Sequence, residues 1–486
     1  MLRKRGVVWL LVAMLVVGLW CVPAIGATAQ HYTQLKFPPL KEVQIPKYER
    51  YVLDNGMVVY LMQDRELPLV GGTAIVRTGN RLEPAVKVGL ATLTGIVMRT
   101  GGTQTHSASE LNQLLEQRAA AVEAGVGESS GSASFSALSE DLEMVFGLFG
   151  EVLRQPIFAQ DKLDLAKTQL RGGIARRNDN PREIVGREFQ KLIYGSTSPY
   201  ARTVEYGTLD NISRQDLVDF YRQYFHPNNI ILGIVGDFDS QQMRSLIQKQ
   251  FGDWKPSQNP QPQLPSVSQT KLGGLFLVNQ PQLTQSYLQI GHLGGQFSNP
   301  DYPALDVLNR VLNGFGGRLF NVLRSRLGLA YSVYGTWSPR YDYPGLFVAG
   351  GQTRSETTVP FIRSLRSEIE RLQAEPVTSA ELAFAKESVL NSFVFNFEQP
   401  SQIISRLMRY EYYGYPADFL FRYQRAVKAT TAADVQRVAK KYLNPEQLVT
   451  LVVGNATAIQ PPLSELAAEV IPVDITIPTT KPIALD

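Results

Sequence analysis

The segment Ser213–Phe238 reads SRQDLVDFYRQYFHPNNIILGIVGDF, and it aligns without gaps with the segment Thr431–Ala456, which reads TAADVQRVAKKYLNPEQLVTLVVGNA. Each copy has helical spacing of its apolar residues, then a proline turn, then a short apolar run typical of a buried strand. Identical residues recur at an offset of 218 residues, among them Asp216 and Asp434, Tyr224 and Tyr442, Pro227 and Pro445, Gly236 and Gly454. A repeat at a fixed offset indicates a duplicated unit.

A second pair of segments supports the duplication. Residues 180–195 read NPREIVGREFQKLIYG, and residues 399–414 read QPSQIISRLMRYEYYG. Their identities lie at an offset of 219: Pro181 and Pro400, Ile184 and Ile403, Arg187 and Arg406, Tyr194 and Tyr413, Gly195 and Gly414. We therefore predict two homologous domains.

The boundaries between the domains follow from composition. Residues 255–270 read KPSQNPQPQLPSVSQT, where Pro, Gln and Ser dominate and apolar periodicity is lost. Such a composition is typical of an extended, solvated linker. We predict an N-terminal domain at residues 48–254, a C-terminal domain at 271–458 and a tail at 459–486.

Each half mixes strand and helix patterns. Residues 51–64, YVLDNGMVVYLMQD, place Asn55-Gly56 between two β-rich runs, which predicts a hairpin. Stretches such as SEDLEMVFGLFGEVLRQ have helical spacing after a serine. We predict the α+β class, with each domain a mostly antiparallel sheet that carries helices on one face.

Composition and charge exclude several classes of protein. The 486 residues are 44% hydrophobic and 19% charged, which excludes a disordered chain, a collagen and a disulfide-stapled mini-protein. The formal net charge of +4 falls to +1 without Arg3, Lys4 and Arg5, and no basic patch carries interleaved aromatic residues. We therefore expect no nucleic-acid partner.

The N-terminal residues 1–29 resemble a secretory signal peptide. A basic stretch precedes 16 apolar residues from Val7 to Val22, and Ala27-Thr28-Ala29 fits a small-x-small cleavage site. An uncleaved anchor is the alternative, although the run is shorter than the ~20 residues that a spanning helix needs. The only cysteine, Cys21, lies inside the run. We expect export, with the bacterial periplasm as destination and no stable membrane span after cleavage.

The segment Gly89–Leu111 reads GLATLTGIVMRTGGTQTHSASEL. Together with the duplicated halves, it resembles the pitrilysin/insulinase (M16) family of metallopeptidases. The zinc helix of that family carries H-x-x-E-H, which places two zinc-binding His on one helix face and supplies a Glu as general base. A further Glu roughly 75 residues on completes the metal shell, and zinc then activates water.

This sequence departs from the zinc motif at every position. Thr92 replaces the first His, Gly95 the Glu and Ile96 the second His, and the distal Glu falls near Gly172 or Gly173. None of these side chains is a good zinc ligand. The four histidines are far apart and none has a His partner at i+3 or i+4, so we interpret all four as structural: His31, His106, His226 and His292. We expect no metal on this chain.

The second half retains a different family signature. Residues 312–337 read LNGFGGRLFNVLRSRLGLAYSVYGTW. The resemblance implies that Arg324 and Tyr331 reach the zinc site of another half, where the Tyr hydroxyl would stabilise an oxyanion and the Arg would hold the substrate backbone. A helix-terminal Arg favoured by the helix dipole and a half-buried strand Tyr are the structural alternative. We expect Gly328 to end the helix.

A glycine-rich loop precedes this helix. It lacks both the P-loop pattern and a complete G-x-G-x-x-G, so phosphate binding is not indicated. The resemblance implies a flexible substrate loop made of Asn313, Gly314, Phe315, Gly316 and Gly317.

Three functional hypotheses follow. The resemblance favours the catalytically incomplete subunit of a heterodimeric M16-type zinc peptidase, with zinc and H-x-x-E-H on a partner chain and a peptide as substrate. The alternative is a non-catalytic scaffold or peptide-binding protein of the same fold. A zinc peptidase that uses unrecognised ligands of its own is the third.

Overall fold

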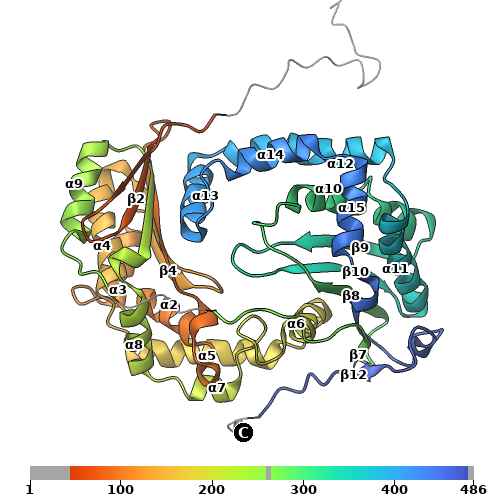
Figure 1. Cartoon of the computed structure of the whole chain (residues 1–486). Coiled ribbons are helices and arrows are strands. Elements are labelled where there is room, and N and C mark those ends of the chain that lie inside the picture. Colours follow the sequence, from red (N-terminus) through yellow and green to blue (C-terminus); the bar gives the residue numbers. More distant parts are fainter. Residues whose placement is uncertain (1–43, 259–263, 480–486) are drawn as a thin grey trace, which may run out of the picture. The chain divides into compact units, whose positions relative to one another are not determined.

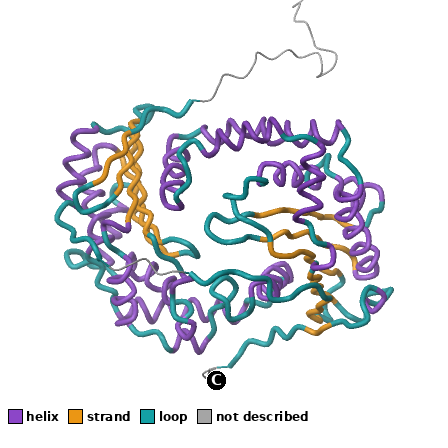
Figure 2. The backbone as a smooth tube through the Cα atoms, in the orientation of Figure 1, coloured by secondary structure: helices purple, strands orange, loops and turns teal. Residues whose placement is uncertain are grey.

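The computed structural model describes residues 44–258 and 264–479 (Figures 1 and 2). The expected signal peptide at 1–29 lies outside the described residues. No helix within the described ranges is both long and apolar enough to cross a bilayer.

The first half builds a six-stranded sheet in the order β1-β2-β6-β3-β5-β4. Only the β2–β6 pair is parallel. The predicted hairpin is confirmed, since β1 and β2 pair antiparallel around Gly56, whose φ is +87°. The strands are β1 (Glu49–Val52), β2 (Val58–Gln63), β3 (Leu69–Val76), β4 (Ala121–Val126), β5 (Gly131–Leu138) and β6 (Ile230–Gly236).

The second half builds a sheet of the same pattern in the order β12-β7-β11-β8-β10-β9. Here β7 pairs parallel with β11 and β12, and the other pairs are antiparallel. The α+β class with two homologous sheets is confirmed. The strands are β7 (Leu275–Asn279), β8 (Gln285–Leu293), β9 (Ala330–Ser338), β10 (Leu346–Arg354), β11 (Val449–Gly454) and β12 (Ile471–Pro472).

Helices cover one face of each sheet, as expected. In the first half they are α2 (Leu90–Thr100), α3 (Ala108–Glu116), α4 (Leu142–Arg154), α5 (Gln160–Arg176), α7 (Tyr206–Asp210), α8 (Arg214–Tyr224) and α9 (Ser240–Phe251). In the second half they are α10 (Tyr302–Leu312), α11 (Thr358–Ala374) and α15 (Ala432–Tyr442), while α12 (Ser379–Ser392) and α14 (Phe419–Ala429) pack mainly on α10 and on each other. The aligned helices α8 and α15 begin in equivalent capping boxes, at Ser213 with Asp216 and at Thr431 with Asp434.

The other face of each sheet carries a helix from the opposite half. Helix α6 (Pro181–Tyr194) belongs to the first half, yet its Ile184 and Phe189 pack with Leu451 of the second sheet. Helix α13 (Pro400–Tyr413) belongs to the second half, and its Met408 packs with Ile231 of the first sheet. The two repeats therefore exchange one helix each, and their cores are interdependent.

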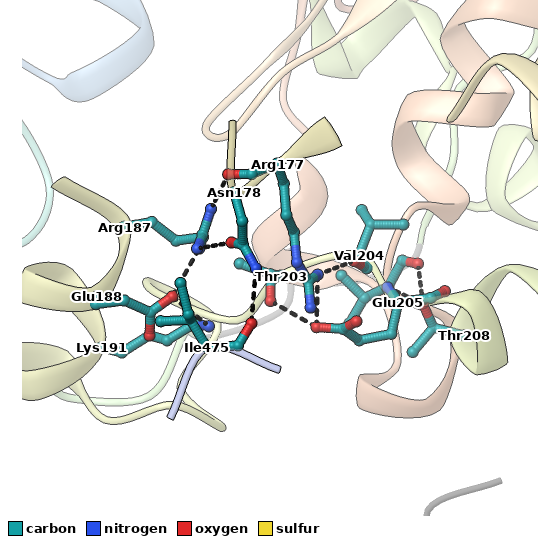
Figure 3. A network of polar contacts seen from close by, with 11 residues as sticks. Arg177, Asn178, Arg187, Glu188, Lys191, Thr203, Val204, Glu205, Thr208 and Ile475 are labelled. Atoms are coloured by element: carbon teal, nitrogen blue, oxygen red, sulfur yellow. Dashed lines mark hydrogen bonds and ion pairs between the residues drawn. The ribbon is translucent and has the colours of Figure 1, made fainter. Parts of the chain in front are cut away.

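The tail segment that follows the second half also contacts both halves. Strand β12 pairs with β7, and the Val473 amide donates to the Leu277 carbonyl at 2.9 Å. Further on, Asn178 donates its side-chain amide to the Ile475 carbonyl at 2.7 Å, and Ile477 packs on the first core (Figure 3). The described part of the tail thus links the second sheet to the first half.

His292 is a buried neutral histidine that makes stability depend on pH. Its Nδ1 lies 2.8 Å from the Leu293 carbonyl, and its Nε2 accepts from the Asn444 amide at 3.2 Å. Burial lowers the pKa of His292 below its usual 6.5. Since the unfolded chain then binds the proton more readily, acid favours unfolding.

We expect that proton uptake by His292 in the unfolded chain lowers the free energy of unfolding by about 1 kcal/mol as the pH drops from 7 to 5. Urea unfolding at both pH values measures this. The His292→Gln variant lacks the titrating group. Its free energy of unfolding should therefore change by about 1 kcal/mol less than that of the wild type over the same pH range. An unchanged pH dependence in the variant would contradict the assignment.

Candidate functional site

The positions of the lost zinc motif lie together on α2, in the first half. Thr92 and Ile96 are partly buried and Gly95 is fully buried. None of them offers an imidazole or a carboxylate. Within residues 44–258 and 264–479, no group of three or more His, Cys, Asp or Glu side chains could hold a metal ion. The residues of this helix therefore do not fit zinc.

Packing also leaves no room for a side chain at Gly95, the position of the family's catalytic glutamate. A Cβ atom at Gly95 would lie 2.4 Å from the Val126 amide nitrogen and 2.7 Å from the Gly125 Cα. Helix α2 thus rests directly on the backbone of β4. No side chain fits there unless the strand moves.

The position of the distal zinc-binding Glu lies in α5, where Gly172 and Gly173 are exposed and no other residue lies close to them.

The start of α2 is held by a residue that sequence analysis missed. The Glu83 carboxylate accepts the Gly89 amide at 3.0 Å and the Ala91 amide at 2.8 Å. Burial raises the pKa of Glu83. No pattern around Glu83 distinguishes it from a surface glutamate.

A polar network fixes the end of α5 beside α6 (Figure 3). Arg177 pairs with Glu205 at 2.8 Å. Arg187 donates to the Arg177 carbonyl at 2.8 Å and to the Asn178 side chain at 2.7 Å. Arg177, Arg187 and Asn178 all bond to other groups of the protein, so we interpret the network as structural.

Arg324 and Tyr331 lie together in the second half. Arg324 belongs to a π-helix at Phe320–Arg326, and Gly328 with φ +61° ends that helix, as expected. The Arg324 guanidinium lies 4.8 Å from the centre of the Phe320 ring and 5.1 Å from the centre of the Tyr331 ring. Among the described residues no carboxylate pairs with this guanidinium, so its N–H donors are open to a ligand.

Tyr331 lies where β9 is irregular. The register of β9 with β10 runs from Ser332 opposite Gln352 directly to Ala330 opposite Thr353, which leaves Tyr331 as the extra residue of a bulge. Bulges redirect side chains and are frequent beside functional sites. The Tyr331 ring is 79% exposed, which differs from the half-buried strand position of the structural alternative.

The glycine loop lies beside this pair. Phe315 is 83% exposed, and its ring centre lies 5.0 Å from that of Phe320. Gly314 has φ +85°, a conformation that favours glycine. A Cβ at Gly316 would lie 2.7 Å from the Phe384 ring. Asn313 does not project freely, because its side chain is bonded to the backbone of Gly335 on β9.

An ion pair that sequence analysis missed anchors the loop to α12. Arg318 is buried and donates Nε to Glu381 at 2.6 Å and Nη2 to the same carboxylate at 3.1 Å. The hydrogen bonds from Arg318 lower the pKa of the Glu381 carboxyl group to about 2. The pair therefore stabilises the folded chain above about pH 4.5 and loses that contribution as the pH falls toward 2.

Arg318→Met should lower the free energy of unfolding by about 2 kcal/mol at pH 7, because it leaves Glu381 without its charged partner. The difference in the free energy of unfolding between the variant and the wild type should shrink as the pH falls from 5 to 2. Urea titrations over this range measure both effects. Arg326→Met, at an exposed position of the π-helix that follows Arg318, is the control. A constant difference across the range would contradict the pairing.

Comparison with known proteins supports the resemblance to the M16 family. Residues 211–389 match the family model described as "Peptidase M16 inactive domain". The resemblance to the M16 peptidase family is thereby confirmed. The matched region includes α10, the glycine loop and the Arg324–Tyr331 pair.

M16-related proteins cover most of the chain. A Rickettsia felis protein named "Uncharacterized zinc protease" is 22% identical over 351 residues, which are 71% of this chain and 83% of that protein. The crystal structure of a peptidase M16 inactive domain from Pseudomonas fluorescens covers 86% of this chain and all of its own, with a TM-score of 0.76 and 24% identity.

A third similarity is to a periplasmic protease. The crystal structure of the periplasmic protease PqqL from Escherichia coli covers 88% of this chain and 49% of its own, with a TM-score of 0.71 and 17% identity. At these identities the structural matches establish the fold.

Proposed function

We propose that this M16 chain is the non-zinc subunit of a two-chain peptidase. A partner M16 chain would carry H-x-x-E-H and the zinc ion, and this chain would supply Arg324, Tyr331 and part of the chamber wall. The observation that carries the proposal is the contrast between the two halves. The zinc positions on α2 carry no ligand side chain and Gly95 is sterically closed, whereas Arg324 and Tyr331 are adjacent and open.

The geometry suits a role in peptide hydrolysis. When water attacks a peptide carbonyl, the carbonyl oxygen gains negative charge, and the exposed Tyr331 hydroxyl can donate a hydrogen bond to it. The Arg324 guanidinium is held over two rings, so its N–H groups are oriented before a ligand arrives. Such preorganised donors stabilise developing charge without further reorganisation.

The proposal extends to the compartment. The apolar leader at residues 1–29 and the similarity to a periplasmic protease support export to the periplasm. The leader would be removed on export.

The decisive test is hydrolysis of a quenched fluorescent peptide. The mature chain is assayed alone and mixed with the H-x-x-E-H protein of the same organism. We expect hydrolysis only in the mixture and its loss with a chelator. Hydrolysis by the chain alone would overturn the metal argument. No hydrolysis with a folded, zinc-loaded partner would favour the scaffold or peptide-binding alternative.

A further inference from the structure

A cavity of about 410 Å³ lies on the helix-covered side of the second sheet, away from the candidate site. Its walls come from α11, from the strands β7 and β11, and from the tail around the 3-10 helix at Leu463–Glu465. In the order of the sheet, β8 and β10 separate β11 from β9, which carries Tyr331. Cavities of roughly 300–1,000 Å³ are the size that holds a small molecule.

Thr450 of β11 lines this cavity and has a buried hydroxyl without a partner. Its neighbours Val449 and Leu451 pack with α6 on one face of the sheet, so Thr450 points to the opposite face, toward α11. Thr450 is 2% exposed, and its Oγ1 makes no hydrogen bond within the described residues. Buried polar atoms without a partner are rare in folded proteins. A ligand that bonds to this hydroxyl would supply the missing partner.

Arg366 of α11 adds a guanidinium with little of its bonding capacity used. Among the described residues its one partner is the Pro445 carbonyl, to which Nη2 donates at 3.3 Å. Arg363, one turn earlier, also lines the cavity but pairs with the Glu465 carboxylate at 2.9 Å. The other N–H groups of Arg366 are therefore available for a carboxylate, whose two oxygens match the guanidinium fork.

Two carboxylates of the lining lack a cation. Glu370 lies one turn after Arg366 on α11, and Glu446 lies in the 3-10 helix that precedes β11. Both are exposed, and neither forms an ion pair in the part of the chain that the structure describes. The acidic residues of this part do not form a group that could hold a metal ion. An organic ammonium group is therefore the cation that suits these two carboxylates.

We propose that the cavity binds a small zwitterion with an apolar side chain, either a free amino acid or a dipeptide. Its carboxylate would pair with Arg366, and its ammonium group with Glu370 or Glu446. Its apolar side chain would cover the buried side chains of Ile362 and Leu448, which line the cavity. The site goes beyond the proposed function, although peptide hydrolysis releases molecules of this kind.

The test uses the mature chain alone with three probes. These are leucine, leucyl-leucine, and N-acetyl-leucyl-leucine amide, which lacks both charges. Calorimetric titration should show one site per chain for at least one charged probe, with a Kd below about 1 mM, and no binding of the blocked dipeptide. Tighter binding of leucine would assign the site to free amino acids, and tighter binding of leucyl-leucine would assign it to dipeptides.

Three variants place the ligand in this cavity. Arg366→Met should raise the Kd at least about tenfold, because it removes charge-assisted hydrogen bonds. Arg363→Met, on the same helix, is the matched control and should change the Kd less than about threefold, because this arginine already has a partner. Thr450→Val keeps the shape of the side chain and should raise the Kd about fivefold. It should not lower the midpoint of urea unfolding, since the hydroxyl has no partner in the free chain.

Three results would overturn the proposal. The first is the absence of saturable binding for all three probes, and the second is a blocked dipeptide that binds as tightly as leucyl-leucine. The third is a folded Arg366→Met variant with the Kd of the wild type. Because hydrolysis is not measured here, the outcome of the mixed assay with the zinc partner bears only on the proposed function.

Discussion

Tyr331→Phe is expected to lower turnover of the mixed two-chain enzyme at least tenfold while leaving assembly intact. The substitution removes one hydroxyl from an exposed ring that makes no other polar contact in the described structure, so folding should not suffer. The loss follows because a single hydrogen-bond donor to a developing oxyanion is worth a factor of about 10² to 10³ where it has been removed.

The control is Tyr334→Phe. Tyr334 lies on the same strand, but its hydroxyl accepts from the Gln289 side chain at 3.0 Å. Turnover numbers of both variants are measured at saturating partner, and assembly is followed by sedimentation. Equal turnover for the wild type and Tyr331→Phe would remove Tyr331 from the chemistry. Loss of assembly in Tyr331→Phe would instead make it an interface residue.

Gly95→Glu, which restores the family's catalytic residue, is expected to destabilise the chain by about 3 kcal/mol or more rather than restore activity. The reason is steric, since even a Cβ atom at this position lies 2.4 Å from the Val126 amide nitrogen. Helix α2 and strand β4 would have to separate within a buried core. Thr92→His is the control on the same helix, at a partly buried position.

Urea unfolding measures the loss of stability, and metal analysis of the triple variant Thr92→His, Gly95→Glu, Ile96→His measures zinc. We expect a poorly folded protein without stoichiometric zinc. A triple variant that is stable and holds one zinc ion per chain would show that β4 can move aside, and the steric argument would be wrong.

Much of the fold could be predicted because the repeat is marked by residues with local roles. The aligned proline turns and the capping boxes at Ser213 and Thr431 fix helix and strand ends, and both depend on neighbours close in sequence. The hairpin at Gly56 and the helix end at Gly328 follow from the same kind of local rule.

The exchange of α6 and α13 could not be predicted. Their apolar faces indicate burial, but an amphipathic pattern does not say which of two similar sheets a helix covers. The same limit applies to the candidate site. The family resemblance implied that Arg324 and Tyr331 act together, whereas the bulge at Tyr331 and the asparagine contacts to β9 depend on residues from separate elements.

The exchanged helices impose an order on biosynthesis. The first sheet is complete once β6 has been made, at Gly236, but the helix that covers its second face ends at Tyr413. At roughly 5–20 residues per second, a ribosome needs about ten to thirty-five seconds to add the intervening chain. Throughout that time Tyr60, Met62 and Ile231 have no native covering, so the nascent chain presents an apolar surface that a chaperone can bind.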